Sequence, residues 1–465
     1  MHSDREMGGP MSKVSIVSAD GHAVMPAEVW PEYLEPRYHE YLPAFHRENE
    51  VNARAMFPMN DMLLVPALDL FDADRQYRTE GWAGAWDCDV RLAQMDREGI
   101  AAEVVHHGFF RVADLGFSVM NATYPPDVVD AGVRAYDRWA VDVFGGAADR
   151  LLLVGAMGAC TDLESTLAEI AWVADHGFVG TYAPGFMSVP GLPPLDDEYW
   201  DRVWALYAER GLALVMHGGY GLPQGYAYDR IASTCERIDA EGGGELDLVM
   251  ALVTDIFNHD FVADLRHRRA MWQLMAGGVF DRHPELKLLM TEVRGDWIPA
   301  TLQHFDRTYD ELRDQLPSRR RPSDWWETNC MAGVSFMHKS EVDMLDEIGA
   351  GKMAFGRDYP HAEGTWPNTR DYLRDLFAGV PETDVRKILG ENAVRFFGLD
   401  AARIAAIAEC VGPEIDEITG GAAVDARLVE HFGERCGYLK PAEGGSRLGE
   451  LDDLLRDDLV RMGQR

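Results

Sequence analysis

The sequence predicts an α/β protein built as a (β/α)8 barrel of the TIM type, and two observations support this prediction. Eight short apolar segments, each able to form a buried strand, are separated by segments with helical periodicity. Alternating strands and helices are typical of a parallel sheet with right-handed crossovers, and eight such units predict closure into a barrel. In addition, side chains that bind metals directly follow several of the strands, which places them at one end of the barrel.

The expected elements follow in chain order. The strands are expected at residues 14–17, 102–105, 151–156, 178–182, 212–216, 286–290, 330–336 and 352–355. The helices are expected at residues 90–98, 128–144, 163–175, 199–210, 263–275, 298–315 and 341–348. Short β-branched or Leu-rich runs suit strands that are buried on both faces, and the longer stretches between them have the 3.6-residue period of amphipathic helices.

Four regions make up the expected organisation. Residues 1–12 are a flexible tail, residues 13–400 form the barrel, and residues 401–465 form an acidic helical C-terminal extension. A lid insertion at about residues 25–86 follows strand 1, because so long an irregular stretch in a compact domain is usually functional. A structural wrap around the barrel is the alternative. A second insertion separates strands 5 and 6. The extension caps the barrel, forms a homo-oligomer contact or partly frays, and the sequence leaves all three open.

The charge of the chain excludes two classes of partner. Its 44 basic residues are outnumbered by 78 acidic ones, for a net charge of −34. Nucleic acids and anionic membranes both require a positive face, so neither is an expected partner. The N-terminal segment lacks the apolar core of a signal peptide, and the six cysteines form no C-x-x-C pair. We therefore expect a cytoplasmic enzyme with reduced thiols.

Candidate metal ligands stand just after four of the expected strands. They are Asp20 and His22 after strand 1, His217 after strand 5, Glu292 after strand 6 and Asp358 after strand 8. Carboxylates and imidazoles delivered by separate strands to the mouth of a barrel are how this fold builds a metal site. The pattern therefore predicts a metalloenzyme.

Four motifs give the chain a family resemblance. Asp20-Gly21-His22, Met216-His217-Gly218-Gly219, the segment 280–287 and the segment 355–361 resemble the amidohydrolase-related superfamily, in the branch of aminocarboxymuconate semialdehyde decarboxylase. The resemblance spans about residues 14–400 and implies a barrel with a divalent metal at its C-terminal mouth. Its pattern has two histidines on strand 1, so Asp20 replaces the first of them and His22 matches the second.

The resemblance also covers the later strands. His217 matches the family's strand-5 histidine, Glu292 replaces its strand-6 histidine, and Asp358 matches its strand-8 aspartate, which ligates metal or moves protons. Two imidazoles have thus become carboxylates, which can bridge two ions. Further candidates for a second metal or for supporting contacts are His106, His107, His259 and His361. The expected cofactor is a pair of divalent ions, with iron favoured and zinc or manganese as alternatives.

The carboxylate-rich pattern further resembles the dinuclear-iron monooxygenases of platensimycin-type diterpenoid biosynthesis. This resemblance implies O₂-dependent hydroxylation of a bulky apolar molecule of secondary metabolism, such as a terpenoid acid or its coenzyme A thioester. The alternative is a hydrolase or a non-oxidative decarboxylase that uses metal-activated water, with Asp358 or a histidine such as His361 as the base. A non-enzymatic metal-binding barrel is a third interpretation.

Two features of composition fit an apolar or coenzyme A-linked substrate. The lid is rich in aromatic residues and methionine, among them Trp30, Phe45 and Met56, although core packing explains these equally well. The arginines of segments 266–269 and 319–321 suit phosphate groups, with solvated surface charge as the alternative.

Overall fold

A computed structural model describes residues 12–64, 67–108, 118, 120–252, 265–335, 337–435 and 447–463, with only the backbone described for 57–64 and 187–188. The predicted tail (except Ser12), His259 and part of the C-terminal extension lie outside the described residues. Among the residues described, none of the helices is both long and apolar enough to cross a membrane.

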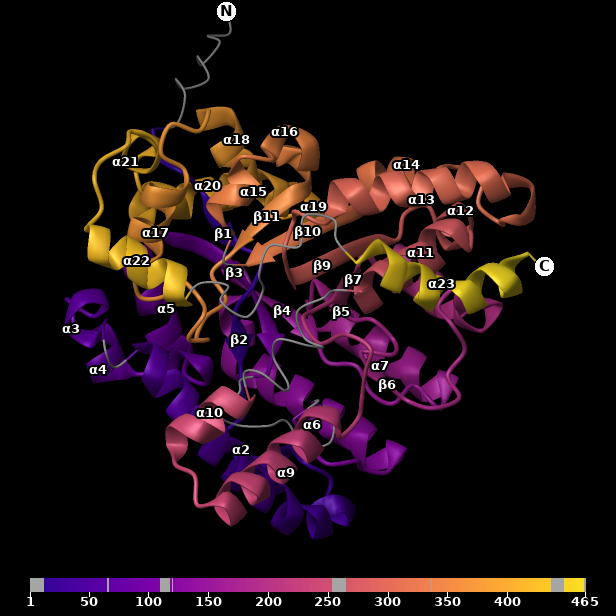
Figure 1. Cartoon of the computed structure of the whole chain (residues 1–465), viewed down its shortest axis with the longest axis horizontal. Helices are drawn as coiled ribbons and strands as arrows, with labels where there is room; N and C mark the ends of the chain where they lie inside the picture. Colours follow the sequence, from indigo (N-terminus) through magenta and orange to yellow (C-terminus); the bar gives the residue numbers. More distant parts are fainter. Residues whose placement is uncertain are drawn as a thin grey trace, which may run out of the picture.

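A ring of parallel strands forms the centre of the molecule (Figure 1). Its order is β1-β3-β4-β5-β7-β9-β10-β11, and β2 continues the first strand along β3. The bounds are β1 Ile16–Ser18, β2 His22–Ala23, β3 Ile100–His107, β4 Leu151–Gly155, β5 Gly180–Tyr182, β7 Ala213–Met216, β9 Lys287–Val293, β10 Cys330–Ser335 and β11 Met353–Gly356. Each of the eight predicted strands overlaps one of these, so the barrel prediction is confirmed.

Backbone hydrogen bonds join the last strand to the first. The amide of Ala19 donates to the carbonyl oxygen of Phe355 at 2.7 Å, and the amide of Asp358 donates to that of Asp20 at 3.0 Å. The strand residues are almost all buried, as expected when side chains fill the inside of the barrel and helices cover the outside. Closure therefore brings the ends of the first and last strands side by side.

Helices cover the outside of the barrel, and most of them connect successive strands, whereas the last three follow the final strand. They are α5 Cys88–Glu98, α6 Pro126–Phe144, α7 Leu163–Asp175, α8 Asp201–Arg210, α11 Leu265–Ala276, α12 Val279–Arg282, α13 Ile298–Leu312, α14 Pro322–Asn329, α15 Lys339–Val342, α16 Leu345–Ile348, α17 Thr369–Leu376, α18 Glu382–Arg386 and α19 Asn392–Phe397. Local sequence sets several ends: Asp87 and Asp162 cap α5 and α7 by accepting from Val90 and Ser165 amides.

The segment predicted as a lid is largely helical. It contains α1 Trp30–Tyr33, α2 Leu42–Leu64, α3 Leu68–Phe71 and α4 Gln76–Glu80. Trp30, Phe45 and Met56 are fully buried in the core. For these three side chains the structure therefore shows core packing.

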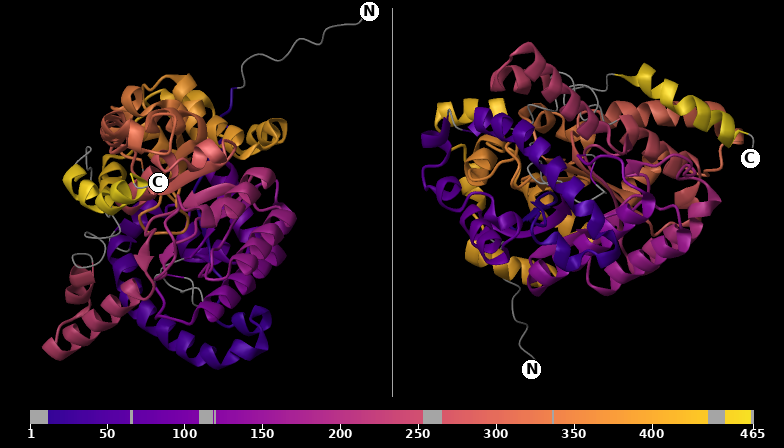
Figure 2. Two further views of the ribbon diagram at one scale, coloured as in Figure 1. Left: turned by 90° about the vertical axis from the view of Figure 1, so that its right-hand side faces the viewer. Right: turned by 90° about the horizontal axis from the view of Figure 1, so that it is seen from below.

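The insertion between β7 and β9 forms a second helical group. Its helices α9 Tyr226–Glu241 and α10 Glu245–Leu252 pack against α2. Figure 2 shows them projecting beside the indigo α2 at the lower end of the molecule, the end toward which β2 continues from β1 in Figure 1. Two insertions that are far apart in the sequence thus meet at this end.

The described part of the C-terminal extension is mostly helical. Its helices are α20 Ala401–Val411, α21 Ile415–Thr419, α22 Ala426–Arg435 and α23 Leu448–Met462. α20 packs against β3, whereas α23 crosses to the other side of the barrel and packs along α11 (Figure 1). The extension therefore contacts the barrel in at least two places.

Candidate metal centre

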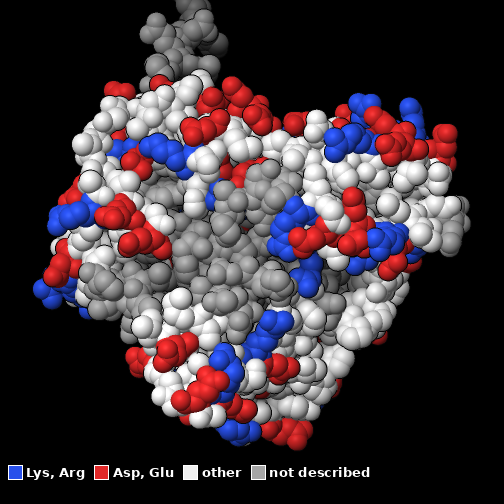
Figure 3. Space-filling view, in the orientation of Figure 1, with Lys and Arg blue, Asp and Glu red and all other residues white. Residues whose placement is uncertain are grey.

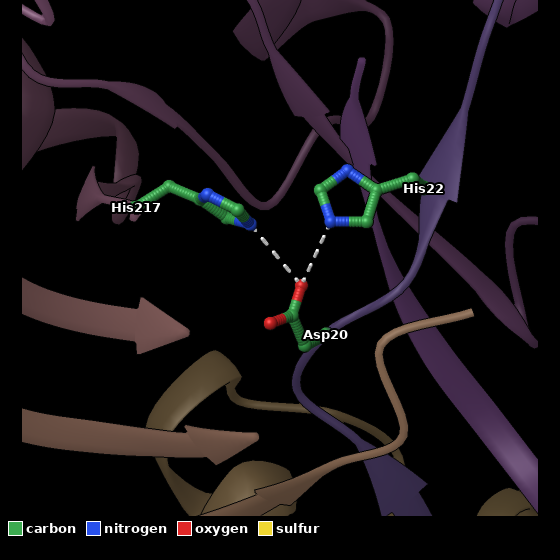
Figure 4. A group of neighbouring side chains, drawn as sticks. All are labelled: Asp20, His22 and His217. Carbon is green, nitrogen blue, oxygen red and sulfur yellow. Dashed lines mark ion pairs between the residues drawn. The ribbon is translucent and has the colours of Figure 1, made fainter. Parts of the chain in front are cut away.

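Three candidate ligands converge on one point at the mouth of the barrel. One carboxylate oxygen of Asp20, Oδ1, lies 3.5 Å from Nε2 of His22 and 3.4 Å from Nε2 of His217. Figure 4 shows the two rings directed at this oxygen from different strands. Asp20 lies in the short break between β1 and β2, and His22 begins β2, so both side chains come from the end of the first strand.

These three atoms suit a metal ion. Asp20 Oδ1, His22 Nε2 and His217 Nε2 are buried and have no hydrogen-bond partner among the described residues, an arrangement that is costly unless a cation satisfies them. Ligand atoms at about 2.1 Å from a tetrahedral ion lie about 3.4 Å apart, close to the separations found here. The residues present therefore fit a divalent cation.

A second group shares His22 with the first. Asp358 Oδ1 lies 3.2 Å from His22 Nε2, and the ring of His361 meets that of His22 edge-on with 4.4 Å between centroids. Ligand atoms of His22, Asp358 and His361 lie close enough together to hold an ion, as do those of Asp20, His22 and His217. The structure thus brings together five of the residues predicted for the site.

The tautomer of His22 is set by strand β3. Nδ1 of His22 lies 3.1 Å from the carbonyl oxygen of His107, to which it can only donate. Nε2 of the neutral ring is then the acceptor and faces Asp20 and Asp358. A metal-binding histidine is commonly oriented in this way by a bond from its other nitrogen.

Glu292 approaches His217 from the opposite side of the ring. Its Oε2 lies 3.0 Å from Nδ1 of His217, whereas Nε2 of that ring faces Asp20. Gly218 gives Glu292 room, since a Cβ at residue 218 would lie 2.7 Å from the Glu292 carboxyl carbon. This places Glu292 behind the histidine, and it belongs to neither of the two groups of described residues that could hold an ion.

Both Glu292 and Asp358 have left-handed backbone conformations. Their φ angles are 54° and 52°, a region that costs free energy for residues other than glycine. Such conformations persist only where the surrounding structure holds them, and they are typical of functional sites. Glu292 lies near the end of β9 and Asp358 just after β11, and their carboxylates face His217 and His22.

His106 and His107 lie nearby in different settings. His106 Nε2 is 3.1 Å from the carbonyl oxygen of Ala19 and 3.9 Å from Asp20 Oδ1. The ring of His107 packs against that of Tyr182, with 4.4 Å between centroids. His106 is thus beside the centre, and His107 contributes its backbone carbonyl.

The charges of the site act on one another strongly. Burial alone would raise the pKa of Asp20, but attraction to His217, His106 and His22 holds it well below its usual value. Burial also opposes protonation of His217, yet Glu292 and Asp20 raise its pKa to about 10. Burial and repulsion by His217 lower the pKa of His22 to about 4. The carboxylates of Asp20 and Glu292 thus favour positive charge at the centre. The ring of His22 stays neutral, so its Nε2 is available to bind a metal ion.

Several supporting residues were not predicted from the sequence. Ser335, at the end of β10, donates a hydrogen bond to Oδ2 of Asp20. His267 of α11 has Nε2 2.8 Å from the carbonyl oxygen of His217. Ser335 could have been noticed in the sequence, because it is a polar residue at the end of an apolar strand. Nothing in the sequence places His267 beside His217.

The predicted phosphate-binding arginines are mostly engaged within the protein. Arg268 is buried over the ring of Trp297, Arg269 pairs with Asp458 at 2.7 Å, and Arg321 pairs with Asp310 at 2.8 Å. These contacts agree with the alternative of structural or surface charge. Binding of a coenzyme A thioester stays a prediction.

Fold and site define a metal-binding (β/α)8 barrel enzyme. Residues 26–399 match the family model described as Amidohydrolase, and the chain belongs to this family. The predicted superfamily is thereby confirmed.

Curated relatives agree over one part of the chain. Gamma-resorcylate decarboxylase of Rhizobium sp. (strain MTP-10005) is 31% identical over 136 residues, which are 28% of this chain and 39% of that protein. The same enzyme of Rhodococcus jostii (strain RHA1) is 30% identical over 134 residues, again 28% and 39%. The matches thus span about two fifths of these curated relatives.

Solved structures agree in fold over most of the chain. An amidohydrolase of Mycobacterium avium subsp. paratuberculosis K-10 has a TM-score of 0.56 at 20% identity and covers 84% of this chain and 100% of its own. The 2,6-dihydroxybenzoate decarboxylase of Rhizobium has a TM-score of 0.52 at 21% identity, covering 83% and 99%.

These relatives correct one prediction. O₂-dependent hydroxylation of a terpenoid was the main functional prediction, and it is wrong because the curated relatives are decarboxylases. The comparisons favour the predicted alternative instead. The preference for iron rested on the oxygenase reaction and loses its support with it. The replacement of two histidines by carboxylates was compatible with an oxygenase and with a hydrolase or decarboxylase. The sequence pattern alone favoured the oxygenase, which is wrong.

Proposed function

We propose that this chain is a metal-dependent, non-oxidative decarboxylase of an aromatic acid with a hydroxyl group next to its carboxylate. The observation that supports this most is the convergence of Asp20 Oδ1, His22 Nε2 and His217 Nε2 on one buried point. Membership of the amidohydrolase family and the decarboxylase relatives supply the reaction type.

One divalent ion is proposed, held by Asp20, His22 and His217, with Asp358 either as a further ligand or as the group that moves the proton. Both groups that could hold an ion contain His22, and Nδ1 of that ring is occupied by His107. A single imidazole nitrogen binds only one ion, so the shared histidine favours one metal over two. Carboxylate and imidazole ligands suit manganese, which the solved dihydroxybenzoic acid decarboxylase of Polaromonas sp. JS666 contains.

The ion, when bound, neutralises the negative charge of the substrate's carboxylate and hydroxyl oxygens. The residues of the chain do the rest. Glu292 holds the ring of His217, and His107 holds that of His22. Asp358 or His361 delivers a proton to the ring carbon as its bond to the carboxylate breaks and CO₂ leaves. The proton replaces CO₂, so neither O₂ nor an external electron donor is needed.

Anaerobic turnover tests this proposal. Protein loaded with Mn²⁺ is incubated without O₂ with 2,6-dihydroxybenzoate, other hydroxybenzoates and benzoate, and CO₂ and the phenol are quantified. We expect equal amounts of both from a hydroxybenzoate and none from benzoate. His361→Gln should lower kcat about 100-fold or more if His361 moves the proton, whereas His283→Gln, at the other end of the barrel, should not.

Two results would overturn the proposal. One is metal-loaded protein that decarboxylates no hydroxybenzoate, and the other is consumption of substrate only in the presence of O₂. Cleavage of an ester or amide without CO₂ release would instead support the hydrolase alternative.

A further inference from the structure

A cavity lies beside the barrel mouth, between the family core and the C-terminal helix α23. Its volume is about 610 Å³. The walls come from the loops after β5 and β7, from α11 and from α23. They include Leu192, Tyr220, Arg266, Arg269, Leu454 and Arg461.

The wall formed by α23 is an addition to the family core. The family match ends at residue 399, and α23 spans Leu448–Met462. The solved relatives are covered over nearly their whole length yet cover only 83–84% of this chain. The cavity is therefore a property of this chain rather than of the barrel in general.

Ion pairs fix α23 against the barrel. Arg461 pairs with the buried Asp196 at 2.8 Å between Nη2 and Oδ1. The buried Asp458 accepts from Arg269 at 2.7 Å and from Gln273 at 3.0 Å. Buried, multiply bonded carboxylates hold their partners firmly, so this wall of the cavity is built in place.

One arginine of the cavity is left without such a partner. Arg269 and Arg461 are neutralised by Asp458 and Asp196, whereas Arg266 has no ion pair or hydrogen bond within the described part of the chain. The stem of Arg266 lies against Gly221, where an added Cβ would be 3.0 Å from Cδ of the arginine. On the face shown in Figure 3, basic residues lie interspersed with acidic ones.

The rest of the lining combines apolar residues with Gln273, Asp457 and Asp458. Val189, Leu192, Trp200 and Leu454 face the cavity together with several prolines. A guanidinium beside apolar walls is complementary to a molecule with an anionic end and an apolar stem.

We propose that this cavity binds an organic anion, with its phosphate or carboxylate paired to Arg266 and its apolar stem along Leu192 and Leu454. The amide of Tyr220, whose side chain lines the cavity, donates to the carbonyl oxygen of His217 at 3.0 Å. The anion is therefore either the distal part of the substrate or a separate ligand beside the metal centre. Binding here does not depend on the proposed decarboxylation.

Calorimetric titration of the full-length protein tests the inference with three probes: octyl phosphate, octan-1-ol and inorganic phosphate. We expect octyl phosphate to bind more tightly than either of the others. Arg266→Gln should weaken its binding about tenfold or more, because it removes a charge-assisted contact. Arg427→Gln is the matched control, since it removes the same charge from an exposed residue of α22 and should leave binding unchanged.

The results separate the alternatives. If octyl phosphate and 2,6-dihydroxybenzoate exclude each other on metal-loaded protein, the cavity holds the distal part of the substrate. If they bind together, it holds a separate ligand. No saturable binding of octyl phosphate, or equal binding by wild type and Arg266→Gln, would overturn the inference. Circular dichroism verifies that both variants are folded.

Discussion

Arg91 donates a hydrogen bond from Nη1 to the carbonyl oxygen of His22, with 2.6 Å between the two atoms. The same guanidinium pairs with the buried Glu103 of β3, at 2.6 Å from Nη2 to Oε2. Glu103 also pairs with Arg357, which directly precedes Asp358. One buried network of charges thus connects the strand-1 ligands to the strand-8 aspartate.

Replacing Arg91 by Met should therefore affect both stability and metal binding. The change leaves Glu103 with one partner and the His22 carbonyl without its donor. Breaking a buried ion pair in this way costs about 3–5 kcal/mol of the free energy of unfolding. Urea unfolding and metal analysis measure the two effects. Arg97→Gln, on the same helix but partly exposed beside Glu80, should cost less than about 1 kcal/mol. Equal stability of the two variants would refute the role of Arg91.

The Glu103 carboxylate should make the free energy of unfolding depend on pH. Burial would raise the pKa of Glu103, but Arg357 and Arg91 outweigh burial and lower it. A group whose pKa is lower in the folded state stabilises the protein above its unfolded pKa, about 4.3, and loses this contribution as pH falls through the folded value. The stability difference between wild type and Glu103→Gln should thus shrink as the pH falls below about 4.3.

Urea unfolding at a series of pH values measures that difference. Glu209→Gln, an exposed position on α8, serves as the comparison and should differ little from wild type at any pH. A stability difference between wild type and Glu103→Gln that grows on acidification would contradict a lowered pKa of Glu103 in the folded protein.

Gly218→Ala should weaken metal binding without unfolding the protein. An added Cβ would lie 2.7 Å from the carboxyl carbon of Glu292, so the carboxylate must move away from His217. Loss of a group that orients a metal-binding histidine typically lowers affinity about 10–100-fold. Competition with a fluorescent Mn²⁺ chelator measures the affinity. Gly146→Ala is the control, because a Cβ at residue 146 meets nothing within 4 Å. Unchanged affinity in Gly218→Ala would argue against the orienting role of Glu292.

The metal requirement can be separated from the fold. Removing the ion with a chelator should abolish turnover and restoring Mn²⁺ should recover it, while circular dichroism remains that of a folded barrel. His217→Ala should lose bound metal, whereas His283→Ala should keep it, because His283 lies at the far end of the barrel beside Asp201. Full metal content in His217→Ala would contradict the assigned site.

The fold was predictable because its signal is local. Each buried strand is a short apolar run, and each covering helix has its own period, so the barrel could be derived one segment after another. Helix α2, Leu42–Leu64, was missed because it lacks a clean apolar stripe and contains Pro58. It packs against α9 and α10, which are supplied by a distant insertion.

The site was predictable only in part. Asp20, His22, His217 and Asp358 follow strands, and closure of the barrel then brings them together. The position of Glu292 behind His217 depends on a left-handed backbone that no residue pattern indicates. Arg357 and Glu103 are 254 residues apart, so their pairing exists only in the folded barrel.

Anomalous X-ray diffraction from crystals of the Mn²⁺-loaded protein tests the central claim most directly. We predict one manganese peak within bonding distance of Asp20 Oδ1, His22 Nε2 and His217 Nε2. A peak elsewhere, two peaks at the mouth, or no peak in protein that is active without metal would contradict the account.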